Sequence, residues 1–245
     1  MKKPEDLRAT RHHIALTISL LGLLLTLPVT IDRNNRLGWF DVLVWICLIA
    51  GVWATSRRKR HLVTGVLLLT VTMLLAATRA SIEQLPDWQR VEKVIEVLMR
   101  GLYVVFFGYI AATILGEVLR ARFVTRDHIY GTVAVYLLLG LLWGNVFALV
   151  QYSRPDSFRL VPTETRIAGD GDQIVSSPPT RGESEVQLIY FAFVSMMTVG
   201  YGDVIPQTSF ARMLVLLPAI MGQFYIAVLV ARMVGLVGGA RRRGR

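Results

Sequence analysis

Six long apolar runs divide this chain of 245 residues and govern which folds are open to it. A helix needs about 20 apolar residues to cross a hydrocarbon core of roughly 30 Å, and each run approaches or exceeds that length. Hydrophobic residues make up 53% of the chain, more than an ordinary soluble domain carries. We therefore expect an all-α membrane protein with six transmembrane helices. They are expected at about residues 14–31, 38–55, 62–80, 91–119, 129–151 and 210–237.

Short clusters of lysine and arginine at the ends of these runs account for much of the formal net charge of +10. Such a charge also suits nucleic-acid binding, but membrane topology explains the clusters better, because cytoplasmic loops are rich in basic residues. We therefore expect a multi-pass protein with both termini in the cytoplasm and no nucleic-acid partner. The arginines at 241–245 are also expected to attract anionic lipid. The clusters lie at residues 2–11, 57–60, 120–126 and 241–245.

The basic start of the chain followed by an apolar run also describes a signal peptide. No small-x-small cleavage site follows the run, so a retained first span is the favoured interpretation. The chain has no Asn-x-Ser/Thr site for glycosylation and no long cytoplasmic segment, which favours the plasma membrane of a bacterium, its inner membrane, as the location.

Nothing in the chain points to catalysis or to a bound cofactor. The single cysteine, Cys47, excludes an internal disulfide and a cysteine-based zinc site, and its apolar surroundings predict a small buried hydrophobic residue. No Ser-His-Asp set, metal-ligand cluster or phosphate-binding loop occurs at a credible spacing. The four histidines lie at the expected membrane edges, at positions 12, 13, 61 and 128.

A hexapeptide between two apolar stretches has the composition of a segment that binds a cation through its main chain. Its sequence is Thr198-Val199-Gly200-Tyr201-Gly202-Asp203. Its alternating glycines can take positive φ angles without a Cβ penalty, which lets consecutive carbonyl groups turn the same way. Four copies around one axis would form rings of oxygen atoms that replace the hydration shell of K⁺. These oxygens would come from Thr198, Val199, Gly200 and Tyr201. Asp203 would lie at the mouth, where its charge attracts cations.

The run from Ser195 to Asp203 resembles the selectivity filter of tetrameric potassium channels. In that family a helix, a pore loop and a second helix form one module, which corresponds here to about residues 129–237. The resemblance implies a homotetramer, with Thr198, Val199, Gly200, Tyr201 and Gly202 as ion-binding residues and K⁺ as the permeant ion. One position departs from the pattern: many members carry a second threonine where this chain has Met197, which bears on conductance and blocker sensitivity.

The pore module divides into parts that composition marks clearly. The run at 186–197 is too short to cross a membrane, so it must enter and return as a pore helix, with the negative end of its dipole favouring a cation. The resemblance places Tyr190 and Phe191 in an aromatic cuff behind the filter. The expected parts are an outer helix at 129–151, an extracellular turret at 152–185, the pore helix at 186–197, the filter at 198–203 and an inner helix at 210–237.

The turret is rich in Pro, Gly, Ser, Thr and charged residues. The segments 158–161 and 173–175 are expected to pair as a small hairpin across a Gly-Asp-Gly-Asp turn. Asp170 and Asp172 in that turn invite a calcium site. A turn is favoured, because a dedicated calcium loop supplies six or more oxygens in a longer pattern.

Residues 1–119 are expected to form a four-helix domain in the position of a voltage sensor. A sensor moves three or four charges per subunit, but the fourth helix offers only Lys93 and Arg100. Glu96 lies four residues before Arg100, so a structural ion pair is favoured over a sensing role. We therefore expect weak voltage gating or none. Residues 120–128 form either a helix that joins this domain to the gate or a basic loop that sets topology, and 238–245 form a basic cytoplasmic tail.

Three small-residue features concern helix packing. The pair Gly140 and Gly144, and the set at positions 108, 112 and 116, predict close helix contacts without naming the partner. Gly222, four residues after Pro218, is a candidate hinge by resemblance, although ordinary packing explains a single glycine equally well.

These observations together predict a potassium-selective channel that conducts passively. One alternative is a less selective cation channel of the same fold. Others are a potassium transporter, or its membrane subunit, and a non-conducting subunit that modulates another channel. Transporters of that kind usually carry several pore-loop repeats in one chain, and this sequence contains one.

Overall fold

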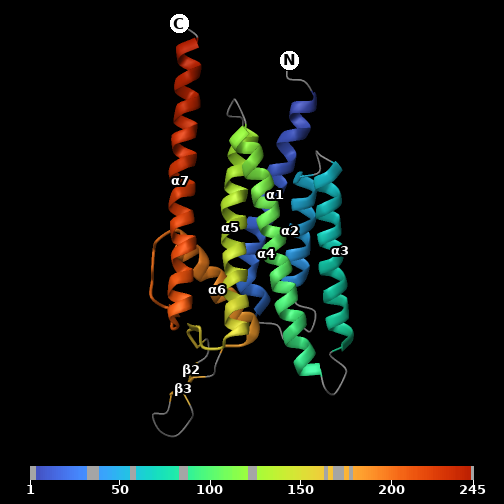
Figure 1. Cartoon of the computed structure of the whole chain (residues 1–245), viewed down its shortest axis with the longest axis vertical. Helices are drawn as coiled ribbons and strands as arrows, with labels where there is room; N and C mark the ends of the chain where they lie inside the picture. The colour runs from blue at the N-terminus through green and yellow to red at the C-terminus, as the bar shows by residue number, and fades with distance from the viewer. Residues whose placement is uncertain are drawn as a thin grey trace.

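The computed structural model describes residues 4–31, 39–55, 59–82, 88–120, 126–162, 165–167, 174–176 and 179–243. Helices make up most of these residues, and the strands are short (Figure 1). The helices are α1 (Pro4–Ile31), α2 (Trp39–Thr55), α3 (Lys59–Ile82), α4 (Trp88–Arg120), α5 (Arg126–Ser153), α6 (Arg181–Met196) and α7 (Ser209–Arg243). The strands are β1 (Phe158–Arg159), β2 (Thr165–Ile167), β3 (Ile174–Ser176) and β4 (Ile205–Pro206).

All seven expected helices are present. Most of their ends lie within a few residues of the expected positions, but α1 begins at Pro4, ten residues before position 14. Helix α6, expected as a pore helix, begins at Arg181 and not at 186, and α7 continues to Arg243, into the segment expected as a tail. In the expected linker, residues 121–125 lie outside the described residues. At 16 residues, α6 is about 24 Å long, which is still short of a hydrocarbon core of roughly 30 Å.

Three helices contain described stretches that are long and apolar enough to cross a membrane: Lys93–Arg120, Asp127–Ser153 and Ser209–Arg232. Shorter apolar stretches lie within α1, α2 and α3 in the part of the chain whose side chains are described. The chain is therefore an all-α membrane protein.

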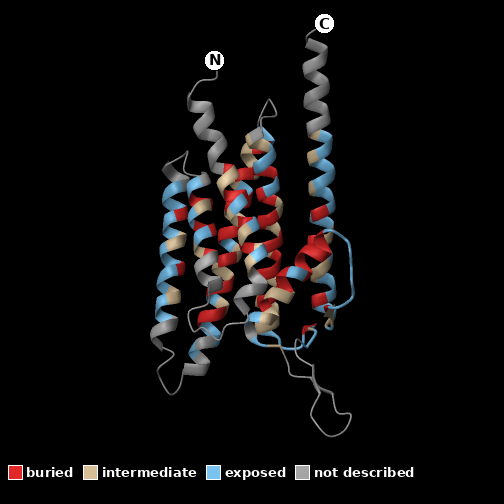
Figure 2. Cartoon of the chain, turned by 180° about the vertical axis from the view of Figure 1, so that it is seen from behind, coloured by how far each residue is buried: buried red, intermediate tan, exposed pale blue. Residues whose placement is uncertain are grey.

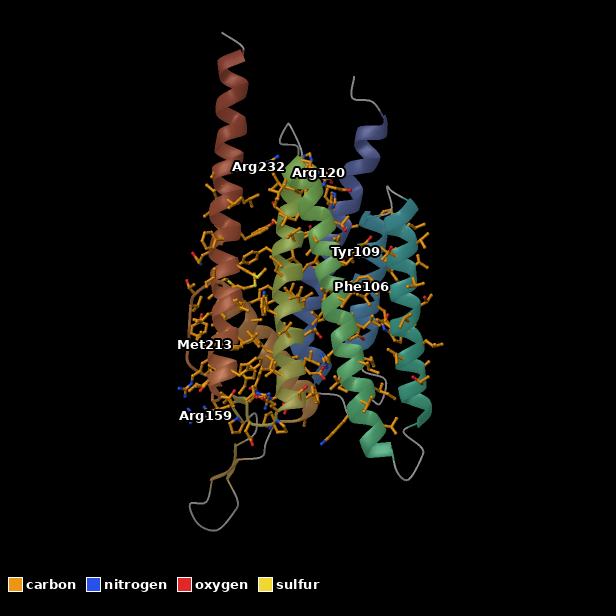
Figure 3. All side chains as sticks on the ribbon, viewed as in Figure 1. Phe106, Tyr109, Arg120, Arg159, Met213 and Arg232 are labelled. Carbon is orange, nitrogen blue, oxygen red and sulfur yellow. The ribbon has the colours of Figure 1, made fainter. Side chains whose placement is uncertain are left out.

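The long helices run side by side, and α6 lies obliquely between α5 and α7 (Figure 1). Helix α1 begins and α7 ends at the same end of the molecule, while β2 and β3 lie at the other end. The labelled arginines lie at both ends: Arg120 and Arg232 lie toward the end where α7 finishes, and Arg159 lies toward the end that holds β2 and β3 (Figure 3).

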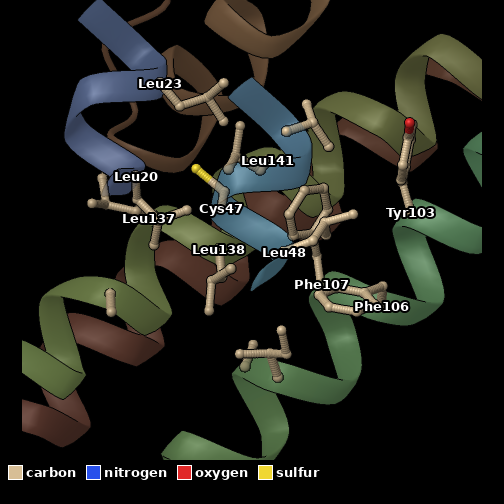
Figure 4. Close-up of a cluster of buried hydrophobic side chains, with 14 of the residues drawn as sticks. Leu20, Leu23, Cys47, Leu48, Tyr103, Phe106, Phe107, Leu137, Leu138 and Leu141 are labelled. Carbon is tan, nitrogen blue, oxygen red and sulfur yellow. The ribbon is translucent and has the colours of Figure 1, made fainter. Parts of the chain in front are cut away.

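A cluster of buried apolar side chains joins α1, α2, α4 and α5 (Figure 4). Leu20, Cys47, Phe106 and Leu138 each come from a different one of these helices. Cys47 is a buried residue of this cluster, as predicted, and its thiol donates to the Ser19 carbonyl oxygen at 3.3 Å. Helices α1 and α4 therefore pack against α5 of the same chain, while α2 packs against α1 and α4.

The glycine pair on α5 packs against α6. A Cβ atom on Gly144 would lie 2.8 Å from the Ile189 Cα, and one on Gly140 would contact the Phe193 ring. The predicted close approach is confirmed, and its partner is α6. The small residues expected to pack on α4 make fewer close contacts with other helices. A Cβ on Gly108 would lie 3.2 Å from Leu142 on α5, but a Cβ on Gly116 would meet nothing within 4 Å.

The expected turret hairpin is wrong in its pairing. Strand β1 pairs antiparallel with β4, which follows the hexapeptide, and β2 pairs with β3. The reason is the burial of Phe158, whose ring lies 5.3 Å from that of Phe147 on α5 and draws β1 onto the helices. The Gly-Asp-Gly-Asp turn, with Asp170 and Asp172, lies outside the described residues.

Candidate functional site

The hexapeptide at residues 198–203, called here the TVGYGD segment, follows directly from the end of α6. The start of α6 is fixed by a capping box. The Thr180 main-chain N–H donates to Glu183 Oε2 at 2.6 Å, and the Glu183 N–H donates to the Thr180 hydroxyl at 3.5 Å. Sequence reasoning missed this start, although the Thr-x-x-Glu spacing that signals it is present.

The other end of α6 sets the direction in which the TVGYGD segment leaves. Met197 caps the helix, and its N–H donates to the Phe193 carbonyl at 2.9 Å. The next two N–H groups also bond back into the last turn, with Val199 reaching the Val194 carbonyl at 3.0 Å. The TVGYGD segment is therefore anchored to α6 through its first two residues.

The φ angles along the TVGYGD segment alternate in sign. Thr198, Gly200 and Gly202 have φ values of +55°, +62° and +79°, while the two residues between them do not take positive values. The predicted positive φ of the two glycines is confirmed. Alternation of this kind turns successive peptide planes the same way, so that carbonyl oxygens gather on one side and N–H groups on the other.

Thr198 also takes a positive φ, which sequence reasoning did not predict. A β-branched residue rarely adopts this conformation, and such strain is typical of functional sites. Its hydroxyl donates to the Met197 carbonyl oxygen at 2.7 Å. No local signal in the sequence marks this angle, because threonine itself disfavours it.

The side chains of the TVGYGD segment are open in the single chain: Tyr201 is 71% exposed and Val199 48%. Tyr201 stacks on Tyr190 of α6, with ring centroids 6.4 Å apart and planes 6° apart. Tyr190 therefore lies beside the segment. Phe191 points to α5 instead, 5.5 Å from the ring of Phe147. The two aromatic residues expected in one cuff thus have different neighbours.

Asp203, at the end of the segment, is exposed and has two hydrogen-bond donors. Its Oδ1 accepts from the Val204 N–H at 2.9 Å, and the Tyr190 hydroxyl also bonds to its carboxylate. In this bond the Tyr190 hydroxyl donates and a carboxylate oxygen of Asp203 accepts.

Gly222 on α7 lies against the C-terminal end of α6. A Cβ atom at this position would contact the Met196 carbonyl oxygen and lie 3.0 Å from its carbonyl carbon. Close approach between two main chains is a reason for glycine that does not depend on bending. The structure thus gives Gly222 a packing partner, and its role as a hinge stays a prediction.

Gly222→Ala is expected to lower the free energy of unfolding by about 1–3 kcal/mol per subunit, because the added methyl group meets main-chain atoms that cannot rotate away. The check is thermal unfolding in detergent. Ala219→Gly, one turn away on α7, is the matched control for backbone flexibility. A Gly222→Ala protein as stable as the wild type would contradict the packing role. A higher open probability of the channel in the Ala219→Gly variant would favour a bend of α7 in this region.

Helix α7 is apolar but mostly uncovered. Only 11% of the most apolar 18-residue stretch of α7 is buried within the chain, against 56% of the corresponding stretch of α5 (Figure 2). Met213, Leu216, Ile220 and Phe224 are among its exposed side chains. A helix of this composition must be covered by lipid or by another protein surface.

Residues 174–238 match the model of a family described as ion channel. The match supports a channel function. It covers β3, α6, the TVGYGD segment, β4 and most of α7, so the geometry above lies within it. A channel of this kind is a membrane protein, which agrees with the apolar helices. No curated protein and no solved structure matches the chain significantly.

Proposed function

We propose that the protein is a potassium-selective channel that conducts K⁺ passively through a homotetramer. The observation that carries the proposal is the alternation of φ at Thr198, Gly200 and Gly202 in a TVGYGD segment held between α6 and an exposed apolar helix. Such a backbone offers a row of carbonyl oxygens to a dehydrated cation. Thr198, Val199, Gly200 and Tyr201 would supply these oxygens, and K⁺ is the transported ion and not a cofactor.

Each part of the site has a task in this proposal. The C-terminal end of α6 carries partial negative charge and favours a cation below the filter. Asp203 raises the local concentration of cations at the outer mouth. Two or more ions in the filter repel one another, so that entry of one drives the exit of another.

Fourfold assembly supports the proposal because one chain carries one TVGYGD segment. The exposed sides of Tyr201, Val199 and α7 would then be covered by neighbouring subunits and by the walls of a central cavity. Helix α1 begins and α7 ends at the same end of the molecule, and Arg120 and Arg232 lie toward that end. This arrangement supports a chain that crosses the membrane six times and has both termini in the cytoplasm. The bacterial inner membrane and anionic lipid at the arginines of 241–245 stay part of the proposal.

The test is a recording from liposomes or bilayers that contain only the purified protein. With K⁺ on both sides, the reversal potential is expected to shift by about 59 mV per tenfold change in the K⁺ gradient, and to respond weakly to Na⁺. A reversal potential that follows both ions would support the less selective channel. Absence of flux would contradict conduction and favour a modulating subunit.

A further inference from the structure

Arg100 lies in the first half of α4 with its side chain 4% exposed, and α4, α5 and α6 supply its partners. Its Nε donates to Glu96 Oε1 on α4 at 3.0 Å, which confirms the predicted i, i+4 pair. Its Nη1 donates to Asn145 Oδ1 on α5 at 3.1 Å. Its Nη2 forms an ion pair with Glu185 on α6. A single guanidinium therefore connects the sensor-like domain, the outer helix and the pore helix.

The partners of Arg100 are themselves held in place. Asn145 donates through Nδ2 to the Leu141 carbonyl oxygen at 2.8 Å, which fixes the orientation of its amide. The Tyr152 hydroxyl donates to Glu185 Oε1 at 3.3 Å, and its ring lies 5.9 Å from the Arg100 guanidinium carbon. The Glu185 side chain is only 10% exposed. The arrangement is therefore fixed from several sides and not a loose surface pair.

A voltage-sensing arginine must move through the membrane field. Movement of α4 along its own axis would carry Arg100 away from Asn145 on α5 and Glu185 on α6, and would leave the Glu185 carboxylate buried without this cation. Removing one member of a buried pair is far more costly than the pair itself. The geometry thus opposes displacement of this charge.

Glu185 is the fifth residue of α6, whose other end leads into the TVGYGD segment. A helix of 16 residues moves nearly as a rigid body, so a shift at Glu185 reaches Met196 and Thr198. Helix α5 contacts α6 at Gly140 and Gly144, and α7 contacts it at Gly222. Through the ion pair between Glu185 and Arg100, α6 contacts the sensor-like domain with one charged group from each partner.

We infer that Arg100 is a positioning residue of the pore helix: through Glu185 it holds α6, and with it the filter, in the conducting arrangement. This inference rests on the proposed function. It assigns the sensor-like domain a static role, in which a fixed charge sets the geometry of the pore helix and does not report membrane voltage.

Glu185→Gln and Glu96→Gln form a matched pair for the test. Each removes one buried carboxylate from Arg100 and preserves its shape, but only Glu185 belongs to α6. Glu185→Gln is expected to lower the K⁺ to Na⁺ permeability ratio about tenfold, the effect of one hydrogen bond to a charged group. Glu96→Gln is expected to change the ratio less than twofold while lowering thermal stability to a similar degree. Equal permeability ratios in the two variants would overturn the inference.

Backbone hydrogen exchange gives a second readout that needs no current. Glu185→Gln is expected to speed exchange of amides in residues 181–196 about tenfold, and Glu96→Gln to leave them within twofold of the wild type. Should Glu185→Gln fail to assemble, Glu185→Asp allows the same comparison because it keeps the charge and shortens the reach. If both variants affect α6 exchange equally, Arg100 has only a general structural role.

Two outcomes separate this inference from the proposed function. A wild-type protein that carries no K⁺ current would contradict the channel, while the exchange experiment still decides whether Arg100 positions α6. A wild-type protein that conducts K⁺, with equal ratios in both variants, would overturn the positioning role alone. Arg100→Gln is also expected to leave the steepness of any voltage dependence unchanged, and a clear loss of steepness would show that Arg100 moves.

Discussion

Gly200→Ala is expected to lower K⁺ current through the proposed channel by at least about a hundredfold. Gly200 has a φ of +62°, where an L-residue with a Cβ costs about 1–2 kcal/mol, so four copies in one ring cost about 4–8 kcal/mol. No atom lies within 4 Å of the added methyl group in the single chain, so the effect is one of backbone conformation. The measurement is K⁺ flux into liposomes at matched protein density.

The control for this variant is Gly182→Ala in the first turn of α6. A Cβ there also meets nothing within 4 Å, but Gly182 does not have a positive φ. Its flux is expected to stay within about twofold of the wild type, since alanine suits a helix better than glycine. Equal flux in the two variants would mean that the positive φ at Gly200 does not matter for conduction.

Gly144→Ala is expected to lower the free energy of unfolding by about 1–3 kcal/mol in each subunit. The added methyl group would lie 2.8 Å from the Ile189 Cα, so α5 and α6 must separate or the helix main chain must shift. Because α6 leads into the TVGYGD segment, K⁺ flux should fall with stability. Thermal unfolding in detergent and flux into liposomes measure the two effects.

Gly116→Ala on α4 serves as the matched control for Gly144→Ala. A Cβ on Gly116 meets nothing within 4 Å, so only the helix propensity of alanine acts. A gain of about 0.5–1 kcal/mol is expected, the usual difference between glycine and alanine in a helix. A Gly144→Ala protein that is stabilised to the same degree would contradict the tight α5–α6 contact.

Local patterns in the sequence predicted the helices well, because an apolar run that crosses a membrane must satisfy its backbone hydrogen bonds within itself. The run at 186–197 likewise indicated a helix too short to cross, and the structure has α6 at Arg181–Met196. The alternating glycines predicted positive φ at Gly200 and Gly202, and both angles are positive. These features depend on residues that are neighbours in the chain.

The turret shows where local reasoning is insufficient. The Gly-Asp-Gly-Asp turn favoured pairing of 158–161 with 173–175, yet β1 pairs with β4 across the 45 residues of intervening chain from 160 to 204. The decisive factor is burial of Phe158 against Phe147 and Phe191, which lie on two helices. Contacts of this kind are set by helix packing and leave no local trace in the sequence.

The sequence by itself determined that this is a helical membrane protein, where most of its helices lie, and that Gly200 and Gly202 take positive φ angles. These features follow from run length, hydropathy and glycine placement, which act over short range. The tertiary structure decided which surfaces meet: Gly144 against Ile189, Gly222 against Met196, and Arg100 with Glu185. Apolar helices can pack together in many ways of similar energy. The choice among them depends on side-chain shape and on the few buried charges, which act only once distant segments are brought together.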